Sequence, residues 1–319
     1  MANFYGQFIG FGAGGVAVTP PFYGESYGYS MGGAVSPAWT LRNTVQRYSF
    51  ASGTQDGADR QDLSVARRFA GGGRSETEGF SAGGHTEGAV SGDEIDNFSF
   101  ANTSNAADHG DLSTPMWGIG TSSMVGYNFI TRGGLNSDTT RIESYATASD
   151  ANANDVGSML LARASMHTGA SSTIAGYAAG GNDNSVTGKP IDKFLFASVG
   201  TISDVGDLTA GRYSTGGNSS ATRGYATGGF QGAGYKNIID AWSFSADGNA
   251  TDVGDLTAAK GELGGNNSSS STENGYTAGG YTTGFISVID KHSFDSGTQN
   301  AATSGDLLEA IVNCAGTQV

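Results

Sequence analysis

Six short segments of the chain alternate apolar and polar residues with the two-residue period of a β-strand. Each reads approximately Ile-Asp-x-aromatic-Ser-Phe, and the copies span residues 45–50, 95–100, 142–147, 191–196, 239–244 and 289–294. Because alternate residues of a strand face opposite sides of a sheet, Ile239 and Ala241 are expected on one face. Asp240 and Trp242, followed by Phe244, are expected on the other. Neither face is wholly polar, which predicts a sheet covered on both sides.

A Gly-aromatic-x-x-Gly-Gly motif precedes each of these segments. The aromatic residues are Tyr29, Phe80, Tyr127, Tyr177, Tyr225 and Tyr276, at intervals of 51, 47, 50, 48 and 51 residues. The third copy is interpreted as Gly126-Tyr127…Gly133-Gly134, with extra residues before its glycine pair. The double glycine predicts backbone with positive φ and a close approach between chains. This regular period identifies the chain as a repeat protein.

A second motif, Asp-x-Gly-Asp-Leu, follows each predicted strand. Its clearest copies are residues 204–208 and 252–256, with looser copies at 59–63, 108–112, 155–159 and 303–307. A basic residue follows four positions later in four copies, as Arg67, Arg163, Arg212 and Lys260. Small residues come next, and they predict an innermost strand that converges on a crowded axis. The motif aspartates are expected to hydrogen-bond turn amides, with calcium ligation as the alternative.

Four strands in each unit of about 50 residues are expected for a propeller blade. The unit resembles the kelch motif, which implies an all-β, six-bladed β-propeller with four-stranded antiparallel blades. The kelch tryptophan of the outer strand is absent, and residues 248–251 read Gly-Asn-Ala-Thr there. The first unit lacks an innermost strand, and residues 311–319 align with that strand elsewhere. We therefore expect the C-terminal strand to close the first blade, with a propeller over residues 23–319 and an N-terminal arm over residues 1–22.

Charge and composition exclude several classes of protein. The chain carries a formal net charge of −14, with 16 basic residues among 30 acidic ones, which argues against a nucleic acid partner. No apolar run is long enough for a membrane span, so no membrane partner is expected. No basic residue precedes the apolar stretch at residues 8–18, so no cleaved signal peptide is predicted. Gly is abundant at 53 residues, as short strands and tight turns require.

No catalytic site is predicted, and the chain is expected to be neither an enzyme nor a holder of a cofactor or metal. Four histidines fall at unrelated points of the repeat, as His85, His109, His167 and His292. Their spacing matches no zinc motif. Galactose-oxidase-like enzymes are catalytic kelch propellers, and their copper site needs histidines and a cysteine linked to tyrosine. Cys314 is the only cysteine here and stands in the expected closing strand, which makes that class the least favoured alternative.

The sequence favours a structural or interaction protein. Loops between Gly-Gly and the next strand, such as residues 182–190 and 230–237, vary between units and are expected on one rim. Repeats of the Gly-Tyr-x-x-Gly-Gly…Asp-Val-Gly-Asp-Leu-Thr type also resemble those in virion proteins of tailed marine bacteriophages. That resemblance implies a tail- or capsid-associated virion component, assembled in the host cytoplasm, with other virion proteins as partners within a symmetric oligomer.

Two sets of aromatic residues are the candidate partner-binding residues. An arm that carries Phe4, Tyr5, Phe8 and Phe11 would attach the propeller to the particle, or pack on it. The alternative function is a lectin-like propeller that binds a glycan or receptor on the host surface. In that case the loop residues Tyr235, Tyr281 and Phe285 would stack on sugars.

Overall fold

The structure is a computed structural model that describes residues 24–51, 57–88, 91–131, 140–163, 167–182, 188–232, 234–264, 267–295 and 297–319. Every regular element in these ranges is a β-strand, and all strand pairs are antiparallel. The predicted all-β class is therefore confirmed. The arm residues Phe4, Tyr5, Phe8 and Phe11 lie outside the described residues.

Within these ranges the strands form six four-stranded sheets, and the first three use the N-terminal half of the chain together with its last strand. The first sheet has the order β29-β1-β4-β5, with β1 (Tyr27–Met31), β4 (Thr44–Ser49), β5 (Ala58–Asp62) and β29 (Ala315–Gln318). The second comprises β6 (Gly71–Arg74), β7 (Glu78–Ala82), β8 (Glu94–Ser99) and β9 (Ala107–Asp111). The third comprises β10 (Gly120–Met124), β11 (Tyr127–Thr131), β12 (Arg141–Ala146) and β13 (Asn154–Ser158).

The remaining sheets follow in chain order. The fourth comprises β14 (Thr168–Ser171), β15 (Ala175–Ala179), β16 (Pro190–Leu195) and β17 (Ser198–Asp207). The fifth comprises β18 (Gly216–Ser219), β19 (Arg223–Thr227), β22 (Ile238–Ser243) and β23 (Thr251–Asp255). The sixth comprises β24 (Ser268–Ser270), β25 (Asn274–Ala278), β26 (Val288–Ser293) and β27 (Ala302–Asp306). Short strands β2 (Ala34–Val35), β3 (Thr40–Leu41) and β28 (Ile311–Val312) form one small sheet, and β20 (Phe230–Gln231) and β21 (Gly234–Tyr235) form another.

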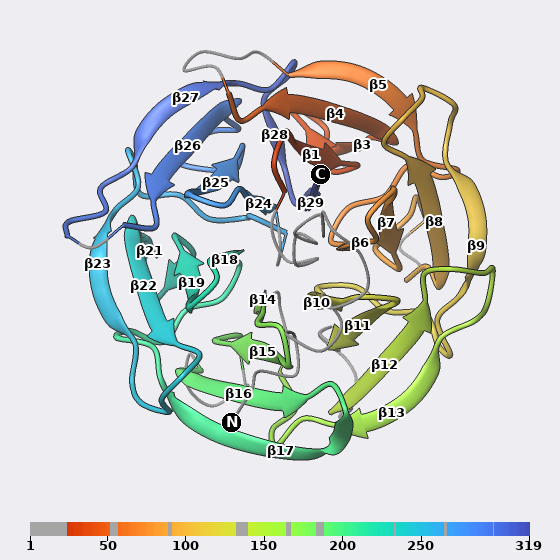
Figure 1. Cartoon of the computed structure of the whole chain (residues 1–319). Helices are drawn as coiled ribbons and strands as arrows, with labels where there is room; N and C mark the ends of the chain where they lie inside the picture. The colour runs from red at the N-terminus through yellow and green to blue at the C-terminus, as the bar shows by residue number, and fades with distance from the viewer. Residues whose placement is uncertain are drawn as a thin grey trace, which may run out of the picture.

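The four-stranded sheets stand around a common centre in a propeller-like arrangement (Figure 1). The short first strands lie inward and the fourth strands lie at the outer edge. Five of the six second strands lead directly into a double glycine, β11 being followed by Arg132, and we call that side of the molecule the glycine rim. The turns between first and second strands lie at the other end of the strands, which we call the hairpin rim. The chain end pairs with the first unit as expected, with Gly28 opposite Gln318 and Met31 opposite Ala315.

Both faces of the third strands are buried. Ile239 and Ala241 belong to one hydrophobic cluster, whereas Trp242 belongs to another with Phe244 packed against it. The predicted alternation is therefore confirmed. The clusters join neighbouring sheets, since Phe244 stacks on Tyr177 of β15 with ring centroids 4.8 Å apart.

The strand register corrects the sequence interpretation of the third unit. Phe129, and not Tyr127, is the buried aromatic residue of β11, because Phe129 pairs with Ser144 as Tyr177 pairs with Lys193. Tyr127 is 48% exposed at the hairpin rim. Residues 128–131 are thus strand, not insertion. The error arose because Asn128 occupies the place of the usual glycine, which hid the motif.

The glycine before each buried aromatic residue makes room for a ring from the third strand. A Cβ atom on Gly224 would collide with the Trp242 ring, and one on Gly176 would collide with the Phe194 ring. In the third unit Asn128 faces Tyr145 across the strands, and its Oδ1 accepts hydrogen bonds from Arg74 N and Ser123 Oγ. The motif glycine is therefore a packing requirement, which one unit meets with a hydrogen-bonded amide.

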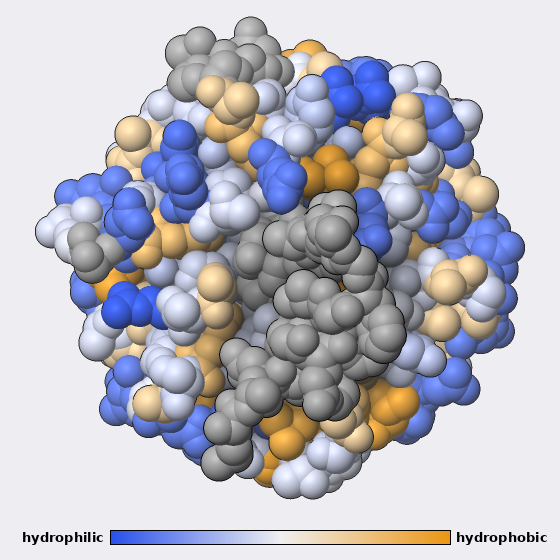
Figure 2. Space-filling view, in the orientation of Figure 1, coloured by the Kyte–Doolittle hydropathy of each residue, from blue (hydrophilic) through white to orange (hydrophobic). Residues whose placement is uncertain are grey.

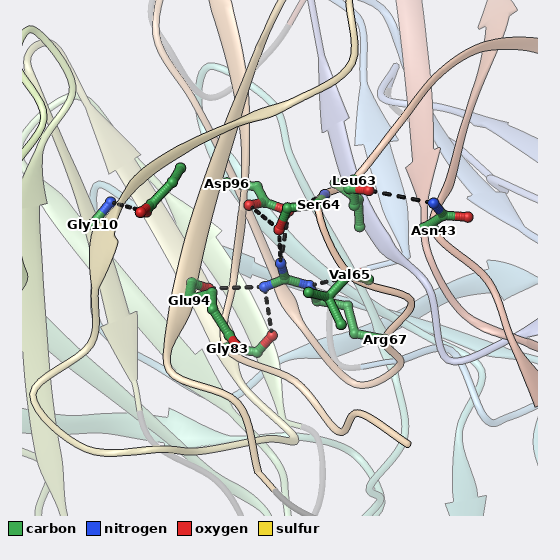
Figure 3. A network of polar contacts seen from close by, with 10 residues as sticks. Asn43, Leu63, Ser64, Val65, Arg67, Gly83, Glu94, Asp96 and Gly110 are labelled. Atoms are coloured by element: carbon green, nitrogen blue, oxygen red, sulfur yellow. Dashed lines mark hydrogen bonds and ion pairs between the residues drawn. The ribbon is translucent and has the colours of Figure 1, made fainter. Parts of the chain in front are cut away.

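A buried ion pair joins the connection between sheets to the sheet that follows. Arg67 Nη2 lies 2.6 Å from Asp96 Oδ2, and Arg67 Nη1 donates to the carbonyls of Gly83 and Glu94 (Figure 3). The aspartate also accepts from the backbone and hydroxyl of Ser64. The same arrangement recurs as Arg163–Asp192, Arg212–Asp240 and Lys260–Asp290, all with buried side chains.

The backbone of each basic residue explains the double glycine. Gly181 N donates to Arg212 O, and Gly229 N donates to Lys260 O. A Cβ atom on the preceding glycine would lie only 2.6 Å from that carbonyl oxygen, at both Gly180 and Gly228. Both glycines of each pair also have positive φ. We call this combination of carbonyl, guanidinium or ammonium, and carboxylate the inter-sheet staple.

Two connections use a different staple. Ile311 O accepts from Gly280 N in the usual way, but the side chain is apolar and the aspartate position holds Gln46. Gln46 Oε1 accepts from Leu308 N at 2.7 Å. At the connection between the second and third sheets, Met116 replaces the basic residue. Glu143 takes the place of the aspartate, and its carboxylate lies near Arg141. The chain thus carries its own uncharged version of the staple, which follows from the cost of burying one charge alone.

The paired residues of the charged staple should be energetically coupled. We expect Arg212→Ile and Asp240→Gln each to lower the free energy of unfolding by about 3 kcal/mol, because each leaves a buried polar partner uncompensated. The double variant reproduces the Ile311 and Gln46 pair and should recover at least about 1 kcal/mol of the summed loss. Urea unfolding of the four proteins measures this coupling. Strictly additive losses would contradict it.

Two buried histidines make the fold sensitive to acid. Burial lowers the pKa of His292 to about 3, and neither ring nitrogen of His292 has a hydrogen-bond partner. Burial also lowers the pKa of His167 to about 3, and its Nε2 lies 2.7 Å from Thr131 Oγ1. The unfolded chain binds these protons near pH 6.5, whereas the folded chain stays neutral. The contribution of these two histidines to stability therefore falls as pH drops below about 6.5.

Replacing His292 by Phe should remove part of this dependence. Phe98 and Phe194 occupy the same place in other sheets, so the ring fits above Gly275. We expect His292→Phe to be more stable than the parent at pH 5, and its loss of stability between pH 7 and pH 5 to be smaller. Chemical denaturation at the two pH values measures both. An unchanged pH dependence would show that His292 does not titrate on unfolding.

Candidate functional site

The glycine rim gathers the residues in which the repeats differ most. Ten of its side chains form a continuous series of ring contacts that we call the aromatic arc: Tyr213, Phe230, Tyr235, Tyr281, Phe285, Trp39, Arg68, Phe69, Trp117 and His85. The arc runs from the fifth sheet through the sixth and first to the second. Since the scaffold positions are nearly the same in every unit, this concentration of unlike residues makes the rim the candidate site.

The first part of the arc contains the aromatic residues predicted from the sequence. Tyr235 and Tyr281 have ring centroids 5.7 Å apart, and Tyr281 and Phe285 have centroids 5.6 Å apart. All three side chains are partly exposed. Burial raises the pKa of Tyr235 to about 12, with Glu262 contributing, so its hydroxyl stays protonated. The structure therefore brings Tyr235, Tyr281 and Phe285 together as neighbours on one rim.

The second part of the arc is built around a cation. Trp39 packs edge-on against Phe285, with ring centroids 4.9 Å apart. The Arg68 guanidinium lies 5.3 Å from the Trp39 ring centroid and 4.8 Å from that of Phe69. Such contacts stabilise a cation between aromatic faces. Sequence analysis missed Trp39 and Arg68 because neither belongs to a repeated motif, although Arg68 directly follows the motif residue Arg67.

Backbone strain collects at the same rim. In the described residues, five amino acids other than glycine have positive φ: Trp39, Phe69, Ser214, Glu262 and Asn313. Four of them stand two positions after the staple residue of their unit. Their backbones join neighbouring sheets, since Phe69 N donates to Asn313 O and Asn313 N donates to Glu262 O. Residues held in this conformation often accompany binding sites.

Glu262 is the acidic group on the inner side of the arc. Burial raises its pKa above the ordinary value, while hydrogen bonding from Asn313 and the charge of Arg68 lower it in part. The Asn313 amide, oriented to satisfy its bonds, donates to Glu262 Oε2 at 3.2 Å. This part of the rim therefore combines aromatic faces with the cation of Arg68 and the partly buried acid Glu262.

The hairpin rim carries a second distinctive surface. Val125 and Tyr127 of the third sheet are 61% and 48% exposed, and Ile174 of the fourth is 63% exposed. Corresponding turns elsewhere are polar, for example Ser75-Glu76-Thr77. A groove of about 240 Å³ lies beside Val125, between the second and third sheets. We call Val125, Tyr127 and Ile174 the hairpin-rim patch.

The axis itself is narrow. Its cavity of about 40 Å³ is lined mostly by Gly, Ala, Ser and Thr from the innermost strands, as expected for a crowded axis. Hydrogen bonds link these strands in sequence: Ser123 N donates to Ser171 Oγ, Ser171 N to Ser219 Oγ, and Ser219 N to Ser270 Oγ. This cavity, lined by described residues, has room for water but not for a sugar ring.

The residues considered for chemistry have structural surroundings. Burial raises the pKa of the Cys314 thiol to about 12, and its Sγ lies 3.3 Å from Gly32 O. A buried thiol of this kind is unreactive. Asp204 and Asp252 each accept a hydrogen bond from the amide two residues later, as expected, but both lie within the outer strands β17 and β23 and not in turns. In the described ranges no group of three or more His, Cys, Asp or Glu side chains is placed to hold a metal ion.

The outer surface is mixed. The face in Figure 2 shows hydrophilic residues most densely towards the outer edge, interrupted by apolar patches. No helix long and apolar enough to cross a membrane occurs in the described part of the chain.

Comparison with known proteins bears on the fold of this chain but not on its function. No protein-family model matches the chain, and no curated protein sequence matches it. Among solved structures, that of YjhT is similar, with a TM-score of 0.66 and 10% sequence identity. The match covers 88% of this chain and 97% of YjhT. At this identity the likeness shows a shared fold alone, in agreement with the all-β, propeller-like architecture.

Proposed function

We propose that this chain is a non-enzymatic interaction protein, and that it is a tail- or capsid-associated component of a bacteriophage virion. The observation that supports this proposal is a division of the molecule: the interior repeats the buried staples, whereas the units differ at the two rims. A rigid body with distinctive surfaces suits assembly better than chemistry. The virion assignment rests on the resemblance of the repeats, and its partners are other virion proteins within a symmetric oligomer assembled in the host cytoplasm.

The scaffold in this proposal is a kelch-like propeller of six blades, closed by the C-terminal strand. Support comes from β29, which pairs with β1 and also contacts both β24 and β6. Phe69 N also donates to Asn313 O, so the last connection bonds to the second sheet. Closure of this kind leaves free edges only at the outermost strand of each sheet.

Deletion of residues 311–319 tests the closure. The shortened chain loses β28, β29 and the carbonyl of Ile311 that holds Gly280. We expect its urea unfolding to lose cooperativity or its midpoint to fall far below that of the full chain. Deletion of residues 1–22, which lie outside the described residues, is the control. A shortened chain that unfolds like the parent would contradict C-terminal closure.

The hairpin-rim patch is the proposed attachment surface, and the first described residue lies on the same rim. Gly24, the first described residue, bridges to Ser271 in a hairpin of the sixth sheet. We expect Val125→Ser with Ile174→Ser to reduce incorporation into purified particles at least about tenfold. Both side chains are exposed, so stability should change by less than about 1 kcal/mol.

The matched control for attachment is Tyr281→Ser on the glycine rim, which should be incorporated normally. Quantitative mass spectrometry of particles gives the ratio of this chain to a major virion protein. Absence of the chain from washed particles would overturn the virion assignment. Normal incorporation of the Val125 and Ile174 variant would overturn this surface as its attachment site.

A lectin-like function is the second candidate, and the aromatic arc favours it. Tyr281 and Phe285 present partly exposed rings that can pack on the apolar faces of sugars. We expect the isolated protein to bind surface glycans saturably, and Phe285→Ala to weaken binding at least about tenfold. A glycan array followed by calorimetry measures this, with Val125→Ser as the control that keeps binding. Absence of saturable binding to any glycan would remove this candidate.

A further inference from the structure

A groove of about 490 Å³ opens on the glycine rim where the first and second sheets meet. Trp39 and Thr40 from the first sheet line one side, and Arg68, His85, Thr86 and Glu87 line the other. The volume is ample for a sugar ring, since ligand pockets commonly measure 300–1,000 Å³. It lies at the end of the aromatic arc, outside the residues that the sequence singled out.

Arg68 differs from the three arginines of the staples. Arg67, Arg163 and Arg212 each pair with an aspartate of the staple. Arg68 forms no ion pair with any carboxylate in the described ranges, and its buried Nε has no hydrogen-bond partner. The guanidinium is held between Trp39 and Phe69, and its backbone pairs with that of His85. The groove therefore contains a fixed cation whose charge is not neutralised by direct contact.

The lack of a carboxylate in contact with Arg68 is informative because the protein is acidic. A chain with net charge −14 has acidic groups to spare, yet none of those described contacts Arg68. Glu262 acts on Arg68 only at longer range and is itself hydrogen-bonded to Asn313. Glu87 also lines the groove and adds a negative charge at its edge. A planar guanidinium beside an aromatic face suits a ligand that combines an anionic group with a flat, partly apolar ring.

Trp39 supplies that aromatic face in a fixed position. Its side chain is 41% exposed, and its φ of 56° is rare for a bulky residue. Contacts with Phe285 and Arg68 hold it there. A side chain that is already ordered loses little conformational entropy when a ligand stacks on it.

We propose that this groove binds an anionic sugar unit, a pyranose that carries a carboxylate or a sulfate group. Arg68 binds the anionic group, Trp39 stacks on the sugar ring, and the hydroxyls of Thr40 and Thr86 face the ring hydroxyls. This proposal rests on the lectin-like candidate function and adds the substrate class and the site. Carboxylate and sulfate share this recognition chemistry, so the test includes both.

Calorimetry with three defined probes tests the proposal: an oligogalacturonate, a sulfated carrageenan oligosaccharide and a neutral cello-oligosaccharide of similar length. We expect at least one acidic probe to bind at least about tenfold more tightly than the neutral one at 0.15 M salt. Arg68→Met should remove that preference, and Arg68→Lys should retain part of it. Whichever acidic probe binds more tightly identifies the anionic group, carboxylate or sulfate, that the groove prefers. Arg42→Met, which removes an arginine paired with Glu309, is the matched control.

Stability and salt dependence keep the result interpretable. If Arg68→Met fails to fold, the parent protein is tested alone. Its affinity for the acidic probe should drop as the salt concentration rises from 0.05 to 0.5 M. Equal binding of acidic and neutral probes overturns the anionic site but leaves a lectin, provided that Phe285→Ala still weakens binding. An acidic preference that survives Arg68→Met in a folded protein overturns the role of Arg68. No binding of any probe or array glycan overturns the lectin candidate as well.

Discussion

The close contact between a glycine pair and the carbonyl of the next staple residue governs this architecture. The carbonyl of Arg212 or Lys260 approaches so near that a side chain on Gly180 or Gly228 would meet it. The side chain of the same residue then reaches an aspartate in the following sheet. One residue thus fixes two sheets, through its backbone on one side and its charge on the other. The spacing of the units is set by this double attachment, because the position of each sheet depends on the connection before it.

This arrangement separates what holds the molecule together from what it can bind. Staples, buried aromatic residues and small inner strands occupy the interior, where every unit must solve the same packing problem. The rims carry no such requirement, so they accept Trp39 and Arg68 in one unit and Phe230 and Tyr235 in another. Two surfaces result, an aromatic and cationic one on the glycine rim and an apolar one on the hairpin rim. They lie at opposite ends of the strands, so they can serve different partners at once.

Most of the fold could be predicted from the sequence because six copies of one unit act as an internal comparison. The strands, the double glycine and the pairing of the chain end all follow from motif spacing, whereas Asp204 was expected in a turn and lies in the strand β17. The third unit was misread by two residues because Asn128 replaces a glycine, and only strand pairing reveals that Phe129 is buried. The rim was only partly predictable. Tyr235, Tyr281 and Phe285 stood out as loop aromatics, whereas the Arg68 and Trp39 contact joins residues from different units that no motif relates.

The hydrogen bonds between innermost strands have a mechanical consequence. Ser123, Ser171, Ser219 and Ser270 are joined by bonds that run around the axis, across the direction of the strands. A pull applied to one of these sheets is therefore transmitted to the neighbouring sheets, at right angles to the strands. Rupture would require several of these bonds to shear together, whereas a lone hairpin can unzip one bond at a time. The third to sixth sheets should therefore resist such a pull as one unit.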